Sequence, residues 1–145
     1  MDSRRGATVL LVEDNPDHAE LAQRALRKGA PDAQVVWSKD GQEALDLLAR
    51  CRNGGKESRP DLVLLDIQMP KVSGYEVVRT IKADPELRTI PVVMMTTSDQ
   101  SQDVAICYEA GANSYVTKPV SFTELIQRIE SVKLYWLLTN RLPSS

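Results

Sequence analysis

Residues with reactive or charged side chains directly follow short apolar runs at four places in the chain. They are Glu13 with Asp14, Asp66, Thr96 and Lys118. Carboxylates held close together repel one another, and a hard divalent cation such as Mg²⁺, which takes oxygen ligands, relieves that repulsion. A lysine and a hydroxyl beside such a centre suit the oxygens of a phosphoryl group. If the four places meet in space, the predicted chemistry is nucleophilic attack by Asp66 to form an acyl phosphate.

Each of these residues also has a simpler explanation when it is considered alone. An aspartate after a strand is most often a helix cap or a surface charge. Glu13 and Asp14 could complement the positive end of a helix that begins at Pro16. Lys118 could be a solvated charge, although a lysine directly before a proline at a strand end is poorly placed for helix support or sheet pairing. The combination of all four places favours the chemical interpretation.

The order of the predicted elements indicates how the chain brings these residues together. Five apolar runs read as strands: Thr8–Val12, Ala33–Trp37, Asp61–Asp66, Ile90–Met95 and Ser114–Thr117. Helical patterns separate them, with Asn15-Pro16 as one helix start and capping boxes opening at Asp40 and Ser121. Such alternation predicts a parallel sheet covered on both faces, with every strand's carboxyl end on one edge. Only the second strand lacks a chemical residue at its end, so an order that places it outermost unites the other four.

Length and composition narrow the class of protein. The 145 residues suffice for one domain, with a core over about 8–132 and an extended helix and tail over 133–145. A net charge of −2 argues against nucleic-acid or membrane-surface partners, and no apolar run approaches the roughly 18 residues of a membrane span. Cys51 and Cys107 lie outside any metal-ligand spacing, which indicates a reduced, cytoplasmic protein. No output domain is expected after Ser145.

Four stretches together resemble the receiver domain of two-component response regulators. They are LLVEDN, DLVLLDIQMPKVSGYEV, IPVVMMTTS and GANSYVTKPV, in that order between Thr8 and about Val132. The resemblance implies a flavodoxin-like (βα)5 fold, a doubly wound parallel sheet of order 2-1-3-4-5. That order has the required outermost second strand.

The resemblance also implies roles for individual residues. Asp66 is the phosphoacceptor, Asp14 a direct Mg²⁺ ligand, Glu13 a ligand largely through water, and the main-chain carbonyl of Gln68 a further ligand. Lys118 pairs with the phosphoryl group, and the Lys118–Pro119 bond is expected to be cis. One departure is the Glu13-Asp14 pair, which stands where many members have two aspartates. Glutamate in place of the first aspartate lengthens the side chain but keeps its charge.

Further roles concern the response to phosphorylation. Thr96 and Tyr115 resemble the switch pair, in which the hydroxyl moves toward the phosphoryl group and the aromatic ring turns inward. Gln68 and Ser98 stand at two positions that tune dephosphorylation in receivers. We interpret His18, the single histidine, as a solvated side chain on the first helical turn. Met94 and Cys107 are expected in the core.

Softer features resemble the single-domain regulators that are paired with bacterial phytochromes. They are DPELRTIPVVMMTTS, the polar loop Asn53–Arg59 and a final helix ending in YWLLTNRLP. This resemblance implies a sensor histidine kinase as the partner. The kinase is expected to dock on the edge around Asp66 and on the first helix.

The end of the last helix is apolar nearly all round, from Leu134 to Leu138. One face of a single domain cannot bury such a stretch, so it either folds back on the chain's own surface or meets a partner. We predict a symmetric homodimer that uses Tyr135, Trp136 and Leu138.

Three other functions fit the residues less well than a response regulator that is phosphorylated on Asp66, and a fourth stays open. A haloacid-dehalogenase-type phosphatase needs a second acid two residues after its nucleophile, and that position holds Gln68. A flavin-binding flavodoxin-like module needs a Ser/Thr-rich phosphate loop after the first strand, which this chain lacks. The intact set of site residues argues against a non-phosphorylated dimerising scaffold. A phosphorelay intermediate remains an alternative, and in either case the catalysis is confined to the protein's own phosphotransfer and dephosphorylation.

Overall fold

The computed structural model describes residues 7–28, 32–52, 59–69 and 71–139. Residues 53–58 of the predicted loop Asn53–Arg59 and residues 140–145 of the predicted tail 133–145 lie outside them. Five parallel strands form one sheet in the order β2-β1-β3-β4-β5, which confirms the predicted (βα)5 topology. The strands are β1 (Thr8–Val12), β2 (Gln34–Ser38), β3 (Leu62–Leu65), β4 (Val92–Thr96) and β5 (Ser114–Thr117). The helices are α1 (Pro16–Arg27), α2 (Gly41–Arg50), α3 (Gly74–Ala83), α4 (Ser101–Ala110) and α5 (Phe122–Lys133), followed by the π-helical turn η2 (Leu134–Thr139).

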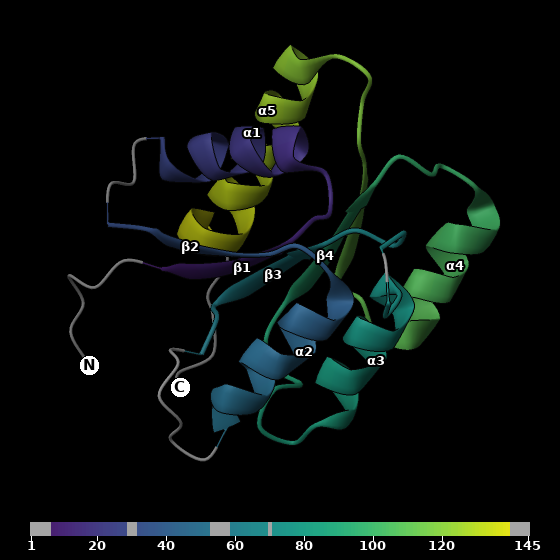
Figure 1. Ribbon diagram of the computed structural model, residues 1–145. Helices are drawn as coiled ribbons and strands as arrows, with labels where there is room; N and C mark the ends of the chain where they lie inside the picture. Colours follow the sequence, from purple (N-terminus) through teal and green to yellow (C-terminus); the bar gives the residue numbers. More distant parts are fainter. Residues whose placement is uncertain (1–6, 29–31, 53–58, 70, 140–145) are drawn as a thin grey trace.

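The helices form two layers around the sheet. Helices α1 and α5 cover one face, and α2, α3 and α4 cover the other (Figure 1). Side chains alternate between the two layers along each strand, so Leu10 and Val12 join the α2–α3 side whereas Val9 and Leu11 join the α1–α5 side. The three inner strands are therefore buried on both faces, as their continuous apolar sequences predict.

Capping side chains set the helix starts close to the expected positions. The Asn15 side chain accepts hydrogen bonds from the backbone N–H groups of Asp17 and His18, and Pro16 occupies the first helical position. Asp40 and Ser121 cap α2 and α5 by accepting from the N–H groups three residues later. These caps begin α1 and α5 directly beside the sheet edge that carries the candidate site.

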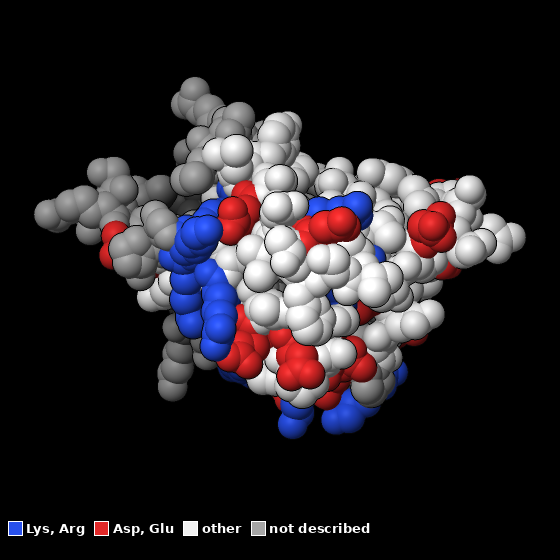
Figure 2. Space-filling view, turned by 90° about the horizontal axis from the view of Figure 1, so that it is seen from above, with Lys and Arg blue, Asp and Glu red and all other residues white. Residues whose placement is uncertain are grey.

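The outer surface of the α1–α5 layer carries both signs of charge. Figure 2 shows this face with one ridge of lysines and arginines, separate acidic groups and neutral surface between them. No single-sign field covers it, in agreement with the small net charge of −2. Within the described part of the chain, every helix is too short or too polar to cross a membrane.

The strand boundaries differ from the prediction by one or two residues. Strand β2 ends at Ser38 instead of Trp37, and β4 begins at Val92 and includes Thr96. Pairing decides these limits, because Thr96 pairs with Thr117 of β5 while Ser38 pairs with Val12 of β1. The hydrophobic pattern alone does not show where a partner strand stops.

Candidate functional site

The carboxyl ends of β1, β3, β4 and β5 meet at one edge of the sheet. Val12 is level with Leu65, and Leu65 with Met94, so the residues that follow β1 and β3 emerge side by side. The Asp66 N–H donates to the carbonyl of Val12 at 3.2 Å, and the Lys118 N–H donates to that of Thr96 at 2.6 Å. The structure thus brings the four sequence-predicted places together.

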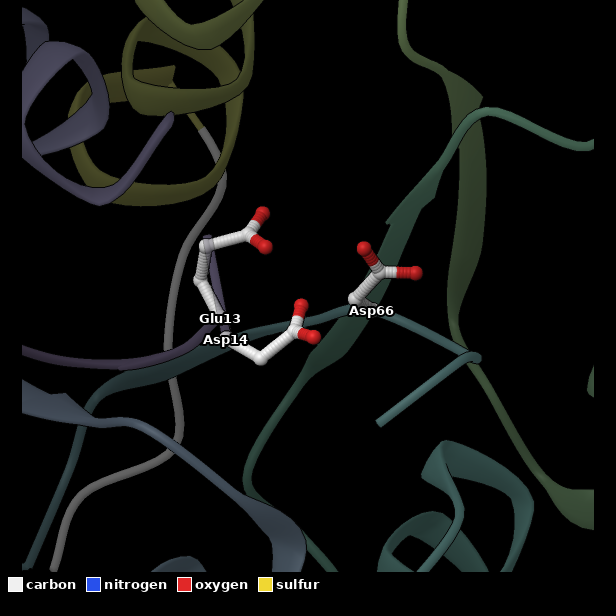
Figure 3. A group of neighbouring side chains, drawn as sticks. All are labelled: Glu13, Asp14 and Asp66. Atoms are coloured by element: carbon white, nitrogen blue, oxygen red, sulfur yellow. The ribbon is translucent and has the colours of Figure 1, made fainter. Parts of the chain in front are cut away.

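Three carboxylates from β1 and β3 point toward a common space (Figure 3). Glu13, Asp14 and Asp66 each offer an oxygen, and these oxygens lie within 4.8 Å of one another. Glu13 and Asp66 are 4% and 9% exposed, whereas Asp14 is open to solvent. An all-oxygen donor set with one open side fits a hard cation that keeps several waters.

Gln68 lies beside this cluster through its backbone. Its N–H donates to Asp66 Oδ1 at 3.2 Å, which fixes the start of the β3–α3 connection against the carboxylate. Its side chain is exposed. The role of its carbonyl as a metal ligand stays a prediction.

Lys118 is the cationic centre of the site. Its side chain is 4% exposed, and Nζ donates to Asp66 Oδ2 at 3.0 Å and to Glu13 Oε1. Burial alone would lower the pKa of Lys118, but the charges of Asp66 and Glu13 and their hydrogen bonds outweigh it and raise the pKa. The ammonium is therefore firmly charged where the phosphoryl oxygens would lie.

Glu13 is held from three directions. Besides its contact with Lys118, its Oε2 accepts the N–H of Asn15 at 3.1 Å, and its backbone carbonyl accepts the indole N–H of Trp37 at 2.7 Å. Burial raises the pKa of Glu13, and the hydrogen bond and charge of Lys118 only partly oppose that rise. Trp37, which is 39% exposed on the outermost strand, thus contacts the backbone of Glu13 beside the carboxylate cluster.

The predicted switch residues occupy β4 and β5. Thr96 is 1% exposed, and the ring of Tyr115 packs against the core on the α2–α3 side of the sheet. The Tyr115 hydroxyl donates to the Ser98 carbonyl at 2.6 Å, which ties the ring to the β4–α4 connection. Burial raises the pKa of Tyr115.

A hydrogen-bonded cluster behind Tyr115 was not predicted. Asp103 of α4 accepts from the Tyr75 hydroxyl at 3.0 Å and from the Ser98 hydroxyl. Burial raises the pKa of Tyr75, and the hydrogen bond with Asp103 adds to the rise. The cluster ties the β4–α4 connection to α3, and nothing in the spacing of these residues along the chain indicates it.

Two expectations about this site are wrong. His18 is half-buried rather than solvated, because its Nδ1 lies 3.2 Å from Lys118 Nζ and its ring packs edge-to-face on Phe122 with centroids 6.3 Å apart. The Lys118–Pro119 bond is trans, as are all peptide bonds of the described residues. The two isomers differ by only about 0.5–1 kcal/mol before proline, so local packing decides between them.

The chain end folds back in part. Trp136 and Leu137 pack against the core of the α1–α5 layer, whereas Leu134 and Tyr135 are 57% and 51% exposed. The Leu138 side chain lies outside the described residues. Of the predicted dimer residues, Tyr135 therefore remains available and Trp136 is largely used by its own domain.

Comparison with known proteins defines the class. A model of the response regulator receiver domain family matches residues 9–130, and the chain belongs to this family. It is 46% identical over 135 residues to the probable methanogenesis regulatory protein FilR2 of Methanothrix harundinacea, covering 93% of this chain and 86% of the relative. It is 35% identical over 144 residues to the response regulator Rcp1 of Synechocystis, covering 99% and 98%.

Solved structures extend the likeness to phytochrome response regulators. The phosphorylated cyanobacterial phytochrome response regulator RcpA superposes with a TM-score of 0.90 at 39% identity, covering 96% of this chain and 99% of that one. The Mn²⁺-bound form of Rcp1 gives 0.87 at 35% identity, with 95% and 99% covered. Receiver domains bind a divalent metal, and the acidic cluster of this chain fits that property.

Proposed function

We propose that this receiver domain accepts a phosphoryl group on Asp66 from a histidine of a sensor kinase and signals through protein contacts. The observation that carries the proposal is the contact of the buried Lys118 ammonium with Asp66 beside two further carboxylates. A nucleophile, a cation for phosphoryl oxygens and a metal-ligand set coincide there. We take the chain to be organised as one such domain over 1–145.

The transfer exchanges one bond to phosphorus for another. An Asp66 carboxylate oxygen attacks the phosphorus of the phosphohistidine, the P–N bond breaks, and its electron pair returns to the imidazole of the donor. Lys118 stabilises negative charge on the phosphoryl oxygens, because its ammonium already lies at Asp66 Oδ2. The Gln68 N–H holds the other Asp66 oxygen and fixes the carboxylate plane.

Asp14, Asp66 and the Gln68 carbonyl, with Glu13 through water, would hold Mg²⁺. The ion would supply positive charge against the phosphoryl oxygens. These residues fit it because their oxygens converge and Asp14 leaves one side open to water. We propose that the ion bound at this site is Mg²⁺ rather than another divalent cation.

Readout of the phosphorylated state would pass through Thr96 and Tyr115. The Thr96 side chain is buried at the end of β4. Thr96 pairs with Thr117 of β5, and Thr117 follows Tyr115 by two residues. Attraction of its hydroxyl to the phosphoryl group would move the start of the β4–α4 connection, to which the Tyr115 hydroxyl is bonded. The surface formed by α4, β5 and α5 would change with it.

The likeness to RcpA and Rcp1 supports a phytochrome-type sensor kinase as the partner, docking at the Asp66 edge and α1. We propose a cytoplasmic protein whose catalysis is limited to its own phosphotransfer and dephosphorylation. A phosphorelay intermediate is the alternative, and a non-phosphorylated dimerising scaffold is disfavoured by the intact Asp66–Lys118 pair.

Phosphoacceptance is tested with acetyl phosphate and Mg²⁺, followed by intact-protein mass spectrometry. We expect one phosphoryl group on the native protein and none on Asp66→Asn. Asp61→Asn is the matched control, since Asp61 precedes the same strand at its opposite end and contacts the Thr8 N–H. Equal phosphorylation of native protein and Asp66→Asn would refute the assignment.

Metal binding has an internal reporter in Trp37, whose indole contacts the Glu13 carbonyl. We expect Mg²⁺ to change its fluorescence and Asp14→Asn to weaken binding at least about tenfold. Trp37→Phe should remove the signal while Trp136→Phe keeps it. Unchanged Mg²⁺ affinity in Asp14→Asn, measured by calorimetry, would contradict the ligand set.

We propose a homodimer through the chain end because the apolar side chains of Leu134 and Tyr135 are exposed. Sedimentation of the native protein should give twice the chain mass, and Tyr135→Lys should give the chain mass. A polar residue at position 136 is unsuitable as a test of the dimer, because the Trp136 ring packs against the domain's own core. A native protein of single-chain mass, in the phosphorylated and unphosphorylated states, would end this part of the proposal.

A further inference from the structure

We infer that His18 is a positioning residue for Lys118: its neutral ring accepts one ammonium hydrogen and holds the ammonium at the α1 side of the phosphoryl site. The inference rests on the proposed phosphotransfer to Asp66. It assigns to α1 a direct part in arranging the reacting groups, beyond forming the surface on which a kinase docks.

The hydrogen-bond count at Lys118 is complete only with His18. An ammonium has three hydrogens to donate and no lone pair. The described residues offer three acceptors around Nζ, namely Glu13 Oε1, Asp66 Oδ2 and His18 Nδ1 at 3.2 Å. Because the lysine side chain is 4% exposed, bulk water is a poor substitute for any of them.

The contact sets a requirement on the histidine. Nδ1 accepts an ammonium hydrogen only with a free lone pair, so the inferred hydrogen bond requires the tautomer that carries its hydrogen on Nε2. The backbone N–H of His18 donates to Asn15 Oδ1, which anchors the first turn of α1. The ring meets Phe122 of α5 at an interplanar angle of 84°, and the two helices thus hold it in place.

His18 differs from the other two acceptors in carrying no charge. If it were absent, both remaining acceptors would be carboxylates, and the ammonium would be drawn toward Glu13 and Asp66. During transfer the ammonium must follow charge that develops on the phosphoryl oxygens while it stays oriented. A neutral third acceptor orients it without competing electrostatically, so loss of His18 should slow the chemical step more than it weakens metal binding.

The test compares His18→Leu with His18→Asn. Asparagine places a carbonyl oxygen close to the position of imidazole Nδ1, whereas leucine fills the space without an acceptor. We expect His18→Leu to be phosphorylated by saturating acetyl phosphate about tenfold more slowly, the size of one hydrogen bond to a charged group. His18→Asn should stay within about threefold of the native rate, and Mg²⁺ affinity should be unchanged in both variants. Equal rates for His18→Leu and native protein, or equal losses in the two variants, would overturn the inference.

A second measurement does not depend on phosphorylation. His18 is the single histidine of the chain, so the imidazole nitrogens of the untagged protein give one set of NMR signals. We expect the Nε2–H tautomer at neutral pH in native protein and a shift of the Nδ1 resonance in Lys118→Met. A protonated ring, an Nδ1–H tautomer or an unmoved Nδ1 resonance would refute the contact. Failure of Asp66 phosphorylation with the expected NMR result would instead refute the proposed function.

Discussion

Gly74 lies against the backbone of Asp66, the proposed phosphoacceptor, and its replacement by alanine should damage the site from outside it. Gly74 is the first residue of α3, and its N–H donates to the Ile67 carbonyl at 2.9 Å. A Cβ on Gly74 would lie 2.2 Å from the carbonyl oxygen of Asp66 and 2.8 Å from the Ile67 Cα. The first distance is 1.2 Å short of the 3.4 Å at which ordinary contact begins. Both neighbours are backbone atoms, so no side-chain rotation relieves the clash.

The expected magnitudes follow from this geometry. Overpacking of a buried site costs about 1–3 kcal/mol, and alanine in place of glycine in a helix returns up to about 1 kcal/mol. We expect Gly74→Ala to lower the free energy of unfolding by about 2 kcal/mol. Relief of the clash requires the Asp66 backbone to move by about 1 Å, a displacement that can reduce a rate by roughly 100-fold.

Gly41→Ala is the matched control. Its Cβ would meet the Val72 carbonyl oxygen, also at 2.2 Å, away from the Asp66 backbone. Urea unfolding should show similar losses of stability in the two variants, while acetyl phosphate should label Gly41→Ala within a few-fold of the native rate. Native-like phosphorylation of Gly74→Ala, or an equal loss in Gly41→Ala, would refute the reasoning that Gly74 positions Asp66.

Three further predictions concern residues outside the metal-ligand set. Lys133→Met should lower the free energy of unfolding by about 2 kcal/mol, because the buried ammonium donates to the carbonyls of Ala25 and Lys28 at the end of α1. Lys28→Met removes an exposed ion pair and should lower the free energy of unfolding in urea by less than about 0.5 kcal/mol. Equal losses in Lys133→Met and Lys28→Met would contradict the capping role of Lys133. Burial, and to a lesser extent the charge of Asp103, raises the pKa of Cys107 to about 11. A thiol reagent at pH 8 should therefore label Cys51 first and Cys107 only upon unfolding. Equal labelling rates of the two cysteines in the native protein would be inconsistent with this. The raised pKa of Tyr75 means that the unfolded state loses its phenol proton first as the pH rises above 10, so native stability should fall there, and Tyr75→Phe should reduce that fall.

The sheet could be predicted from the sequence because its inner strands are buried on both faces. Continuous apolar runs, helix caps at Asn15, Asp40 and Ser121, and the chemical residues after the runs predict an alternating parallel sheet with β2 outermost. The full strand order came from the resemblance to receiver domains. The sheet edge then follows, since parallel strands with right-handed crossovers share one carboxyl end. Glu13, Asp14, Asp66 and Lys118 meet as expected for this reason.

The missed features depend on contacts between distant helices. The interpretation of His18 as solvated used only its place on the first turn of α1, but Phe122 of α5 and Lys118 after β5 enclose it. The apolar stretch Leu134–Leu138 predicts burial on the chain's own surface or on a partner, and only the structure shows that Trp136 packs on the core of the α1–α5 layer. Periodicity along one helix identifies its buried stripe but not which neighbour covers a given residue.

The charges of the site favour the binding of a divalent cation even though Lys118 is present. Glu13, Asp14 and Asp66 contribute three negative charges against one positive charge, so the formal balance is −2 before any phosphoryl group arrives. His18 completes the hydrogen bonds of Lys118 but adds no charge, and burial together with Asp66 already raises the pKa of Glu13. A phosphoryl group on Asp66 increases the negative charge further. A divalent cation at these oxygens would therefore stabilise the folded protein and the acyl phosphate by the same electrostatic attraction, which links the stability of the domain to its readiness for phosphorylation.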